Sequence, residues 1–299
     1  MYSQMVIPLD GSSVSEQVLP YARLLARKLH LPVELLAVVN AVGLAASLSP
    51  DEKKNVESLI AHTWRDSAAF LERISQTFPE VSVKCTVENG RPGEVVTEKA
   101  AADSGTLIAM ATHGRSGIDR WLLGSVAEKV LRGTRNPLLL VRAGKSGESV
   151  GEARLVRIIV PLDGSALAEK ALPHAMVLAK TMNLELLLLR AYTLTQIIST
   201  YDDYVPDWNK LTAVSKGEAI SYLDQKVREL KQNGLTLISP LVLEGEAAEQ
   251  IIDLAHRTAN SLVVMCSHGR SGVGRWVLGS VAERVARHSF GPVLLIRAV

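Results

Sequence analysis

Short apolar runs alternate with amphipathic segments along the whole chain. Val6-Ile7 and Ile158-Ile159-Val160 each lead into Pro-Leu-Asp-Gly-Ser, at residues 8–12 and 161–165. Such runs, bounded by turn residues, are typical of strands buried on both faces of a parallel sheet. A predicted helix follows each one, with apolar residues at helical spacing: Leu19, Ala22, Leu25, Ala26 and Leu29 in one place, and Leu172, Ala175, Leu178, Ala179 and Met182 in the other.

The same succession of elements continues to the end of each half. Further strands are predicted at 33–39, 81–87, 106–111 and 137–142, and again at 186–189, 235–243, 262–266 and 292–297. In the first half, one helix is predicted over residues 51–77 and another ends near Asp103, and residues 41–50 are expected to form a loop. In the second half, the equivalent helices end near Gln232 and near Asn260. Alternating strands and helices predict α/β architecture, with two tandem doubly wound domains, each a parallel sheet flanked by helices.

A glycine-rich turn occurs in both halves. Residues 113–117 (His-Gly-Arg-Ser-Gly) and 121–128 return as 268–272 and 276–283, and the copies align without a gap through Arg142 and Arg297. This repeat indicates two copies of one domain. We place them at residues 1–143 and 154–299, joined by a polar, glycine-rich linker at 144–153.

Composition excludes several classes of partner. The chain has 299 residues, a formal net charge of +2, 4% aromatic residues and two cysteines. Balanced charge and few aromatics argue against nucleic acid or anionic membrane as partners. We find no signal-peptide pattern and no apolar run of membrane-spanning length, and the sparse cysteines indicate a reducing compartment. These features predict a cytoplasmic protein.

Candidate chemistry gathers where the strands end. In open α/β sheets, ligands bind at the carboxyl ends of strands where the strand order reverses. Asp10 and Asp163 follow the first strands, and the glycine-rich turns follow the fourth. An aspartate here can accept hydrogen bonds from a ribose hydroxyl or an adenine amino group, or it can merely form a turn and cap the next helix.

The residues Gly124-Ser125 and Gly279-Ser280 stand directly before predicted helices. Amide groups at a helix N-terminus bind anions, and Arg115, Arg120, Arg270 and Arg275 supply positive charge nearby. The sequences 125–128 and 280–283 (Ser-Val-Ala-Glu) also fit a capping box, which does not exclude a ligand.

Other chemistries fit less well. His113 with Ser116, or His268 with Ser271, suggests nucleophilic catalysis, but Gly-Arg-Ser-Gly lacks the residue between serine and glycine found in a nucleophile elbow. Cys266 and His268 lack further ligands at zinc spacing, so we expect no metal site and assign no catalytic residue. The chain has neither a P-loop nor a dinucleotide-binding glycine pattern after a first strand.

The chain resembles a tandem universal stress protein over both halves. The family signature is Gly-x-x-Gly, nine residues, then Gly-Ser/Thr, and it maps onto 111–114 with Gly124-Ser125 and onto 266–269 with Gly279-Ser280. Pro-Leu-Asp at the first strands and the turns at Gly90 and Gly245 also match. The resemblance implies five parallel strands in each domain, with the fifth strands paired between domains, so that one chain mimics a homodimer; two such chains could associate further.

The family's ATP-binding members imply sites for ATP, with a divalent cation such as Mg²⁺ or Mn²⁺ on its phosphates. Asp10 and Asp163 would face the adenosine, and the base pockets would be lined by Pro8, Leu9 and Val38, and by Pro161, Leu162 and Ala191. Ribose and phosphates would be held by Gly114, Gly124, Ser125 and Val126, and by Gly269, Gly279, Ser280 and Val281. The remaining turn residues of the two predicted sites are Ala111, His113 and Arg115, and Cys266, His268 and Arg270.

The first glycine of the signature is replaced in both halves, by Ala111 and by Cys266. If this position requires a positive φ or a bare backbone contact, a side chain there costs on the order of 1 kcal/mol or more. Alanine should be tolerated better than cysteine, so we expect the first repeat to be the better nucleotide site.

Together with these residues, the resemblance implies a nucleotide-binding stress-response regulator or sensor that is non-catalytic or hydrolyses ATP very slowly. A nucleotide-free scaffold for protein association is the alternative, and a hydrolase acting through His113 and Ser116 is a third reading.

Overall fold

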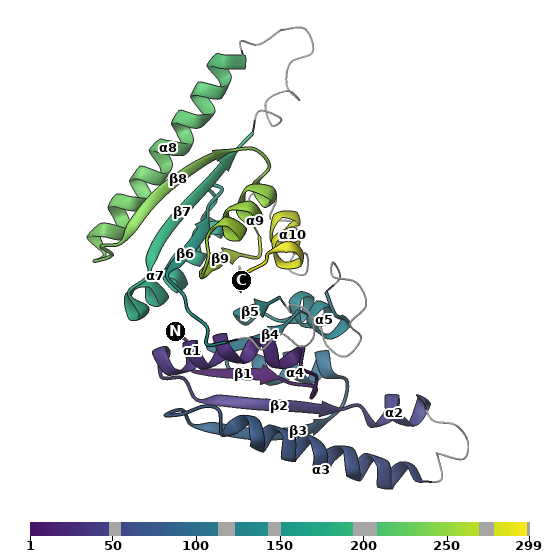
Figure 1. Ribbon diagram of the computed structural model, residues 1–299. Helices are drawn as coiled ribbons and strands as arrows, with labels where there is room; N and C mark the ends of the chain where they lie inside the picture. Colours follow the sequence, from purple (N-terminus) through teal and green to yellow (C-terminus); the bar gives the residue numbers. More distant parts are fainter. Residues whose placement is uncertain (48–54, 113–122, 143–150, 194–207, 269–277, 298–299) are drawn as a thin grey trace. The chain divides into compact units, whose positions relative to one another are not determined.

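The structure is a computed structural model that describes residues 1–47, 55–112, 123–142, 151–193, 208–268 and 278–297 (Figure 1). The chain divides into two compact units, Met1–Arg154 and Leu155–Ala298. Each unit contains its own parallel sheet and its own buried apolar core.

The sheet of the first unit has the strand order β3-β2-β1-β4-β5. Its strands are β1 (Gln4–Pro8), β2 (Val33–Val39), β3 (Val83–Asn89), β4 (Thr106–Ala111) and β5 (Leu138–Val141), all paired in parallel. Met5, Val6 and Ile7 of β1 are fully buried, and every residue of β4 is buried, as expected for central strands covered on both faces. The order reverses between β1 and β4, which makes the edge above them the topological switch point.

Helices cover both faces of this sheet. They are η1 (Ser15–Val18), α1 (Leu19–Leu29), α2 (Ala41–Ser47), α3 (Val56–Ser75), α4 (Pro92–Ala101) and α5 (Ser125–Gly133). Arg23 of α1 donates to Thr77 after α3 (3.1 Å), and α4 packs against α5. Right-handed crossovers put α1 and α3 on one face and α4 and α5 on the other.

The second unit repeats this arrangement. Its strands are β6 (Arg157–Pro161), β7 (Glu185–Tyr192), β8 (Ile238–Glu244), β9 (Ser261–Cys266) and β10 (Val293–Ile296), parallel in the order β10-β9-β6-β7-β8. Its helices are α6 (Ala166–Glu169), α7 (Ala171–Met182), α8 (Trp208–Gln232), α9 (Ala247–Arg257) and α10 (Ser280–His288). In Figure 1, α8 runs alongside β7 and β8, which it contacts.

The predicted fold class is confirmed, with five parallel strands described in each unit. Pairing of the fifth strands between the units stays a prediction.

Some predicted element boundaries were wrong. Residues 41–47 form α2 instead of a loop, because Asn40 Oδ1 accepts a hydrogen bond from the Gly43 amide (2.9 Å) and alanine favours helix. Leu235 does not begin β8: its amide donates to the Leu230 carbonyl (3.1 Å) and closes α8, beyond Gly234 at φ +81°.

The helices α1 and α7 end in the same left-handed conformation, at His30 and Asn183, both with φ 52°. Both side chains are exposed, and each backbone amide donates to the last turn of its helix. Glycine adopts this conformation without the steric cost of a Cβ, and asparagine tolerates it better than most residues do.

We therefore expect His30→Gly to raise the free energy of unfolding by about 0.5–1 kcal/mol. Asn183→Gly is the matched control and should have a smaller effect. Urea unfolding of the full chain measures both, and a destabilised His30→Gly variant would contradict the strain argument.

Candidate functional site

A cavity of about 280 Å³ lies at the switch point of the first unit. It is walled by the ends of β1, β2 and β4 and by the first turns of α4 and α5. Eight predicted site residues line it: Pro8, Leu9, Asp10, Val38, Ala111, Gly124, Ser125 and Val126. His113, Gly114 and Arg115 lie outside the described residues.

The second unit has a larger cavity at the equivalent place, of about 620 Å³. Nine predicted residues line it: Pro161, Leu162, Asp163, Ala191, Cys266, His268, Gly279, Ser280 and Val281. Gly269 and Arg270 lie outside the part of the chain that the structure describes. In each unit, predicted site residues that lie up to about 120 positions apart in the sequence therefore meet around one cavity.

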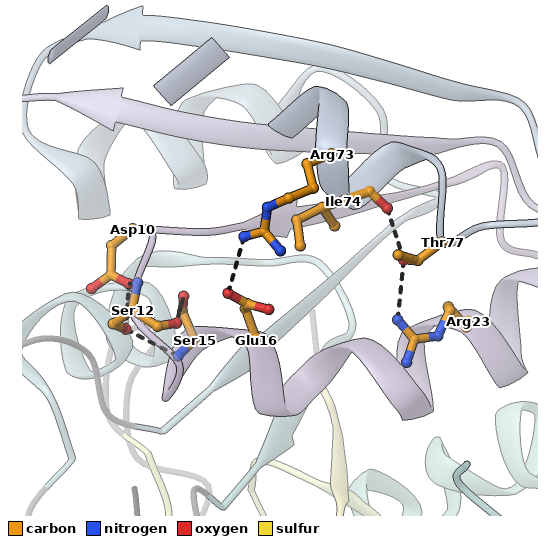
Figure 2. A network of polar contacts seen from close by, with 8 residues as sticks. All are labelled: Asp10, Ser12, Ser15, Glu16, Arg23, Arg73, Ile74 and Thr77. Atoms are coloured by element: carbon orange, nitrogen blue, oxygen red, sulfur yellow. Dashed lines mark hydrogen bonds and ion pairs between the residues drawn. The ribbon is translucent and has the colours of Figure 1, made fainter. Parts of the chain in front are cut away.

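A tight turn fixes the aspartate of the first cavity (Figure 2). The Ser12 amide (3.0 Å) and the Ser12 hydroxyl both donate to Asp10 Oδ1, and Gly11 between them has φ +80°. Ser12 Oγ in turn accepts from the Ser15 amide (3.1 Å) at the start of η1. Asp10 thus forms an aspartate turn, as one sequence interpretation held, and the residue also lines the cavity.

The second aspartate is held in the same way. Asp163 Oδ1 accepts from the Ser165 amide (2.9 Å) across Gly164, which has φ +87°. Ser165 Oγ accepts from the Ala168 amide (3.1 Å) and caps α6. In both units the carboxylate is oriented by backbone before any ligand arrives.

The predicted capping boxes are wrong. The N-cap residues of α5 and α10 are Gly124 and Gly279, and Ser125 and Ser280 are the first helical residues. A glycine has no side chain with which to cap the helix, so its backbone carbonyl serves only as the first helical acceptor, at 2.8 Å from the Glu128 or the Glu283 amide. These helix N-termini consequently present amide groups to the cavities without a capping side chain of the N-cap residue.

Each glycine also anchors its helix to the sheet. The Gly124 amide donates to the Thr112 carbonyl (2.7 Å), just beyond β4, and the Gly279 amide donates to the Ser267 carbonyl (2.9 Å), just beyond β9. Thr112 and Ser267 are buried. The positive end of each helix dipole is therefore held directly above the end of the fourth strand.

The expected strain at Ala111 and Cys266 does not arise. Both are the last residues of extended strands, and neither is among the described residues with positive φ. Their side chains are buried and form part of the cavity walls. The backbone therefore gives no reason to prefer the first repeat.

Cys266 and His268 both line the second cavity. Burial raises the pKa of the Cys266 thiol. Burial, and then the charge of Arg297, lowers the pKa of His268, whose Nδ1 lies 3.0 Å from Ser267 Oγ. His268 Nε2 is buried and has no hydrogen-bond partner within the described residues. That nitrogen is available to a polar ligand atom.

Several lining residues escaped the sequence analysis. In the first unit they are Ser15, Leu36, Pro92, Val96, Met110, Thr112 and Ala127. Leu36 could have been predicted from Val38, because residues two apart in a strand lie on the same face and both belong to β2. Nothing in the sequence points to Val214, Ser215 and Glu218, because their approach to the second cavity depends on how α8 packs.

The universal stress protein family matches residues 1–142 and 156–297. The chain belongs to this family. The resemblance inferred from the signature is thereby confirmed, in its tandem form.

Universal stress proteins of one and of two domains are similar to this chain. Universal stress protein E of Salmonella typhi is 22% identical over 316 residues, covering 99% of this chain and 95% of its own. Universal stress protein YxiE of Bacillus subtilis is 32% identical over 146 residues, covering 47% of this chain and 98% of its own. A crystal structure of an Archaeoglobus fulgidus universal stress protein has 21% identity and a TM-score of 0.66 and covers 98% of both chains, which supports the fold.

No helix in the described parts of this universal stress protein combines the length and the apolar character needed to cross a membrane.

The aspartate turn gives a stability prediction. Ser12→Ala removes the hydroxyl that links Asp10 to the Ser15 amide, and we expect it to lower the free energy of unfolding by about 1 kcal/mol. Ser13→Ala, at the exposed neighbouring residue, is the matched control and should change little. Equal effects of the two substitutions in urea unfolding would show that the turn does not stabilise the unit.

Proposed function

We propose that each repeat binds an adenine nucleotide, and that the protein is a nucleotide-responsive regulator of a stress response. In this proposal the chain turns over ATP very slowly or not at all. The observation that carries it is the pairing, found twice, of a glycine-capped helix N-terminus with a preoriented aspartate around one cavity.

The residues present fit a nucleotide in three respects. The first-turn amides of α5 and α10 suit phosphate oxygens, since they carry the positive end of a helix dipole. The apolar walls, such as Pro8, Leu9 and Val38, suit the faces of a purine ring. The carboxylate of Asp10 or Asp163 suits ribose hydroxyls or an amino group, which are hydrogen-bond donors.

A bound nucleotide would bring its own divalent cation on its phosphates. Among the described residues, no three His, Cys, Asp or Glu side chains cluster in a way that could hold a metal ion. We therefore assign no protein ligand to that cation.

The first experiment identifies nucleotide released from freshly purified, denatured protein, counted per chain by chromatography. It is followed by calorimetric titration with ATP, AMP and cyclic AMP. Two equivalents per chain support the proposal in both repeats. Absence of binding after titration with ATP and Mg²⁺ would reject it and favour the nucleotide-free scaffold.

Charge reversal at the helix N-termini locates the sites. Aspartate is a favoured N-cap residue, so Gly124→Asp and Gly279→Asp should fold while placing a carboxylate on the amides that the phosphates need. We expect each to weaken binding at its own cavity on the order of 100-fold. Gly124→Asn and Gly279→Asn are uncharged controls of similar shape and should lose less. Unchanged affinity in both aspartate variants would refute the placement.

The extended backbone at Cys266 gives a further prediction. Cys266→Gly should not improve binding at the second cavity, because no positive φ is relieved there. Titration of the Gly124→Asp background, in which only the second site is open, measures this. A marked gain in affinity would revive the strain argument.

A further inference from the structure

The walls of the two cavities are built from equivalent residues of the two repeats. Every described residue that lines the first cavity has a counterpart lining the second, as with Pro8 and Pro161, Val38 and Ala191, or Gly124 and Gly279. The pairing of Pro8 with Leu36, and of Pro161 with Leu189, sets the same register in β2 and β7. The cavities are thus comparable position by position.

The second cavity nevertheless has more than twice the volume, about 620 against about 280 Å³. Nine residues that line the second cavity have no described counterpart lining the first. Three of them are Gly245, Glu246 and His268; the other six lie at the end of β7 and on α8, and we call these six the β7–α8 extension. They are Arg190, Tyr192, Thr193, Val214, Ser215 and Glu218. By this register, Ala37 and Val39 of β2 are the positions equivalent to Arg190 and Tyr192 of β7. Among the described residues, neither Ala37 nor Val39 nor any residue of α3 lines the first cavity.

The extension has a defined framework. The Arg190 guanidinium stacks over the Tyr222 ring of α8 at 4.7 Å, and the Tyr222 hydroxyl donates to Glu169 of α6 (2.8 Å). Lys226 pairs with the same carboxylate at 2.9 Å. Tyr192 donates to Glu244 (3.2 Å). These contacts hold β7, α6 and α8 together around the added space.

The position of the extension relates it to one end of a nucleotide. The glycine-capped terminus of α10 lies above β9, and β6 separates β9 from β7 in the sheet. Phosphates at α10 would therefore put the base toward β7, and the extension would then lie beyond the base. Ser215 offers a hydroxyl, and the carboxylates of Glu218 and Glu246 line the same cavity. Arg190 of the extension is also charged, but its guanidinium is stacked on Tyr222 and the two carboxylates outnumber it, so this wall favours a hydrogen-bonding or cationic group over an anionic one.

We propose that the second repeat binds a nucleotide enlarged at its base end by a polar or cationic substituent, which occupies the β7–α8 extension. The first repeat has no described counterpart of this extension and binds the unsubstituted nucleotide more tightly than the enlarged one. This inference rests on the proposed function, and it assigns different ligands to the two repeats.

The test compares ATP with N6-(6-aminohexyl)-ATP, which carries an ammonium group on a chain attached to the base. Calorimetry uses the full-length Gly279→Asp variant, with only the first site open, and Gly124→Asp, with only the second. We expect the first site to bind the analogue about tenfold or more weakly than ATP, because the substituent overpacks its cavity. The second site should bind the analogue at least as tightly as ATP.

A filling substitution tests the location. In the Gly124→Asp background, Ser215→Trp should weaken binding of the analogue about tenfold more than binding of ATP. Ser221→Trp, at an exposed position of the same helix, is the matched control and should leave the ratio unchanged.

The outcomes separate the two proposals. ATP binding at both sites, with the analogue rejected or accepted equally at both, overturns the assignment of different ligands and leaves the proposed function standing. Failure of both sites to bind either compound overturns both proposals. An unchanged ratio in Ser215→Trp overturns the location.

Discussion

The arrangement depends on one constraint, the burial of parallel strands on both faces. Parallel pairing places all strand carboxyl ends at one edge of the sheet. Each crossover helix begins at that same edge, so its N-terminus lies there too. The strand order β3-β2-β1-β4-β5 reverses between β1 and β4, so the helices on either side diverge there and leave a crevice at this edge. The equivalent order in the second unit leaves a crevice between β6 and β9. In each unit, the cavity, the aspartate turn and the helix with a glycine N-cap all lie at that edge of the sheet.

Much of this was predictable because its signals are local. Strands such as Thr106–Ala111 are continuous apolar runs, and Asp-Gly-Ser encodes a turn through the positive φ of Gly11 and Gly164. The predictions failed where one residue had two possible roles. Ser125 fits a capping box in sequence, but the helix begins one residue earlier than that motif requires, with Gly124 as its N-cap. The motif fits because Ser-Val-Ala-Glu is equally acceptable within a first turn.

Other features were beyond sequence reasoning because they depend on packing. The φ of Cys266 is set by its place in β9, so a rule derived from glycine alone misjudged it. In the sequence, Arg190 looks like any other residue of the β7 strand. Only its stacking on Tyr222 shows that this face of the strand packs against α8. The wall residues that are equivalent in the two cavities were thus accessible to pattern analysis, whereas the difference in volume between the cavities was not.

The joining of two unlike cavities in one polypeptide has a consequence for stoichiometry. Separate chains with different cavities would have to find one another, and random pairing would yield like and unlike combinations in proportions set by expression. Here each molecule carries one narrow and one wide cavity. The ratio of the narrow to the wide cavity is therefore one to one at any abundance of the protein.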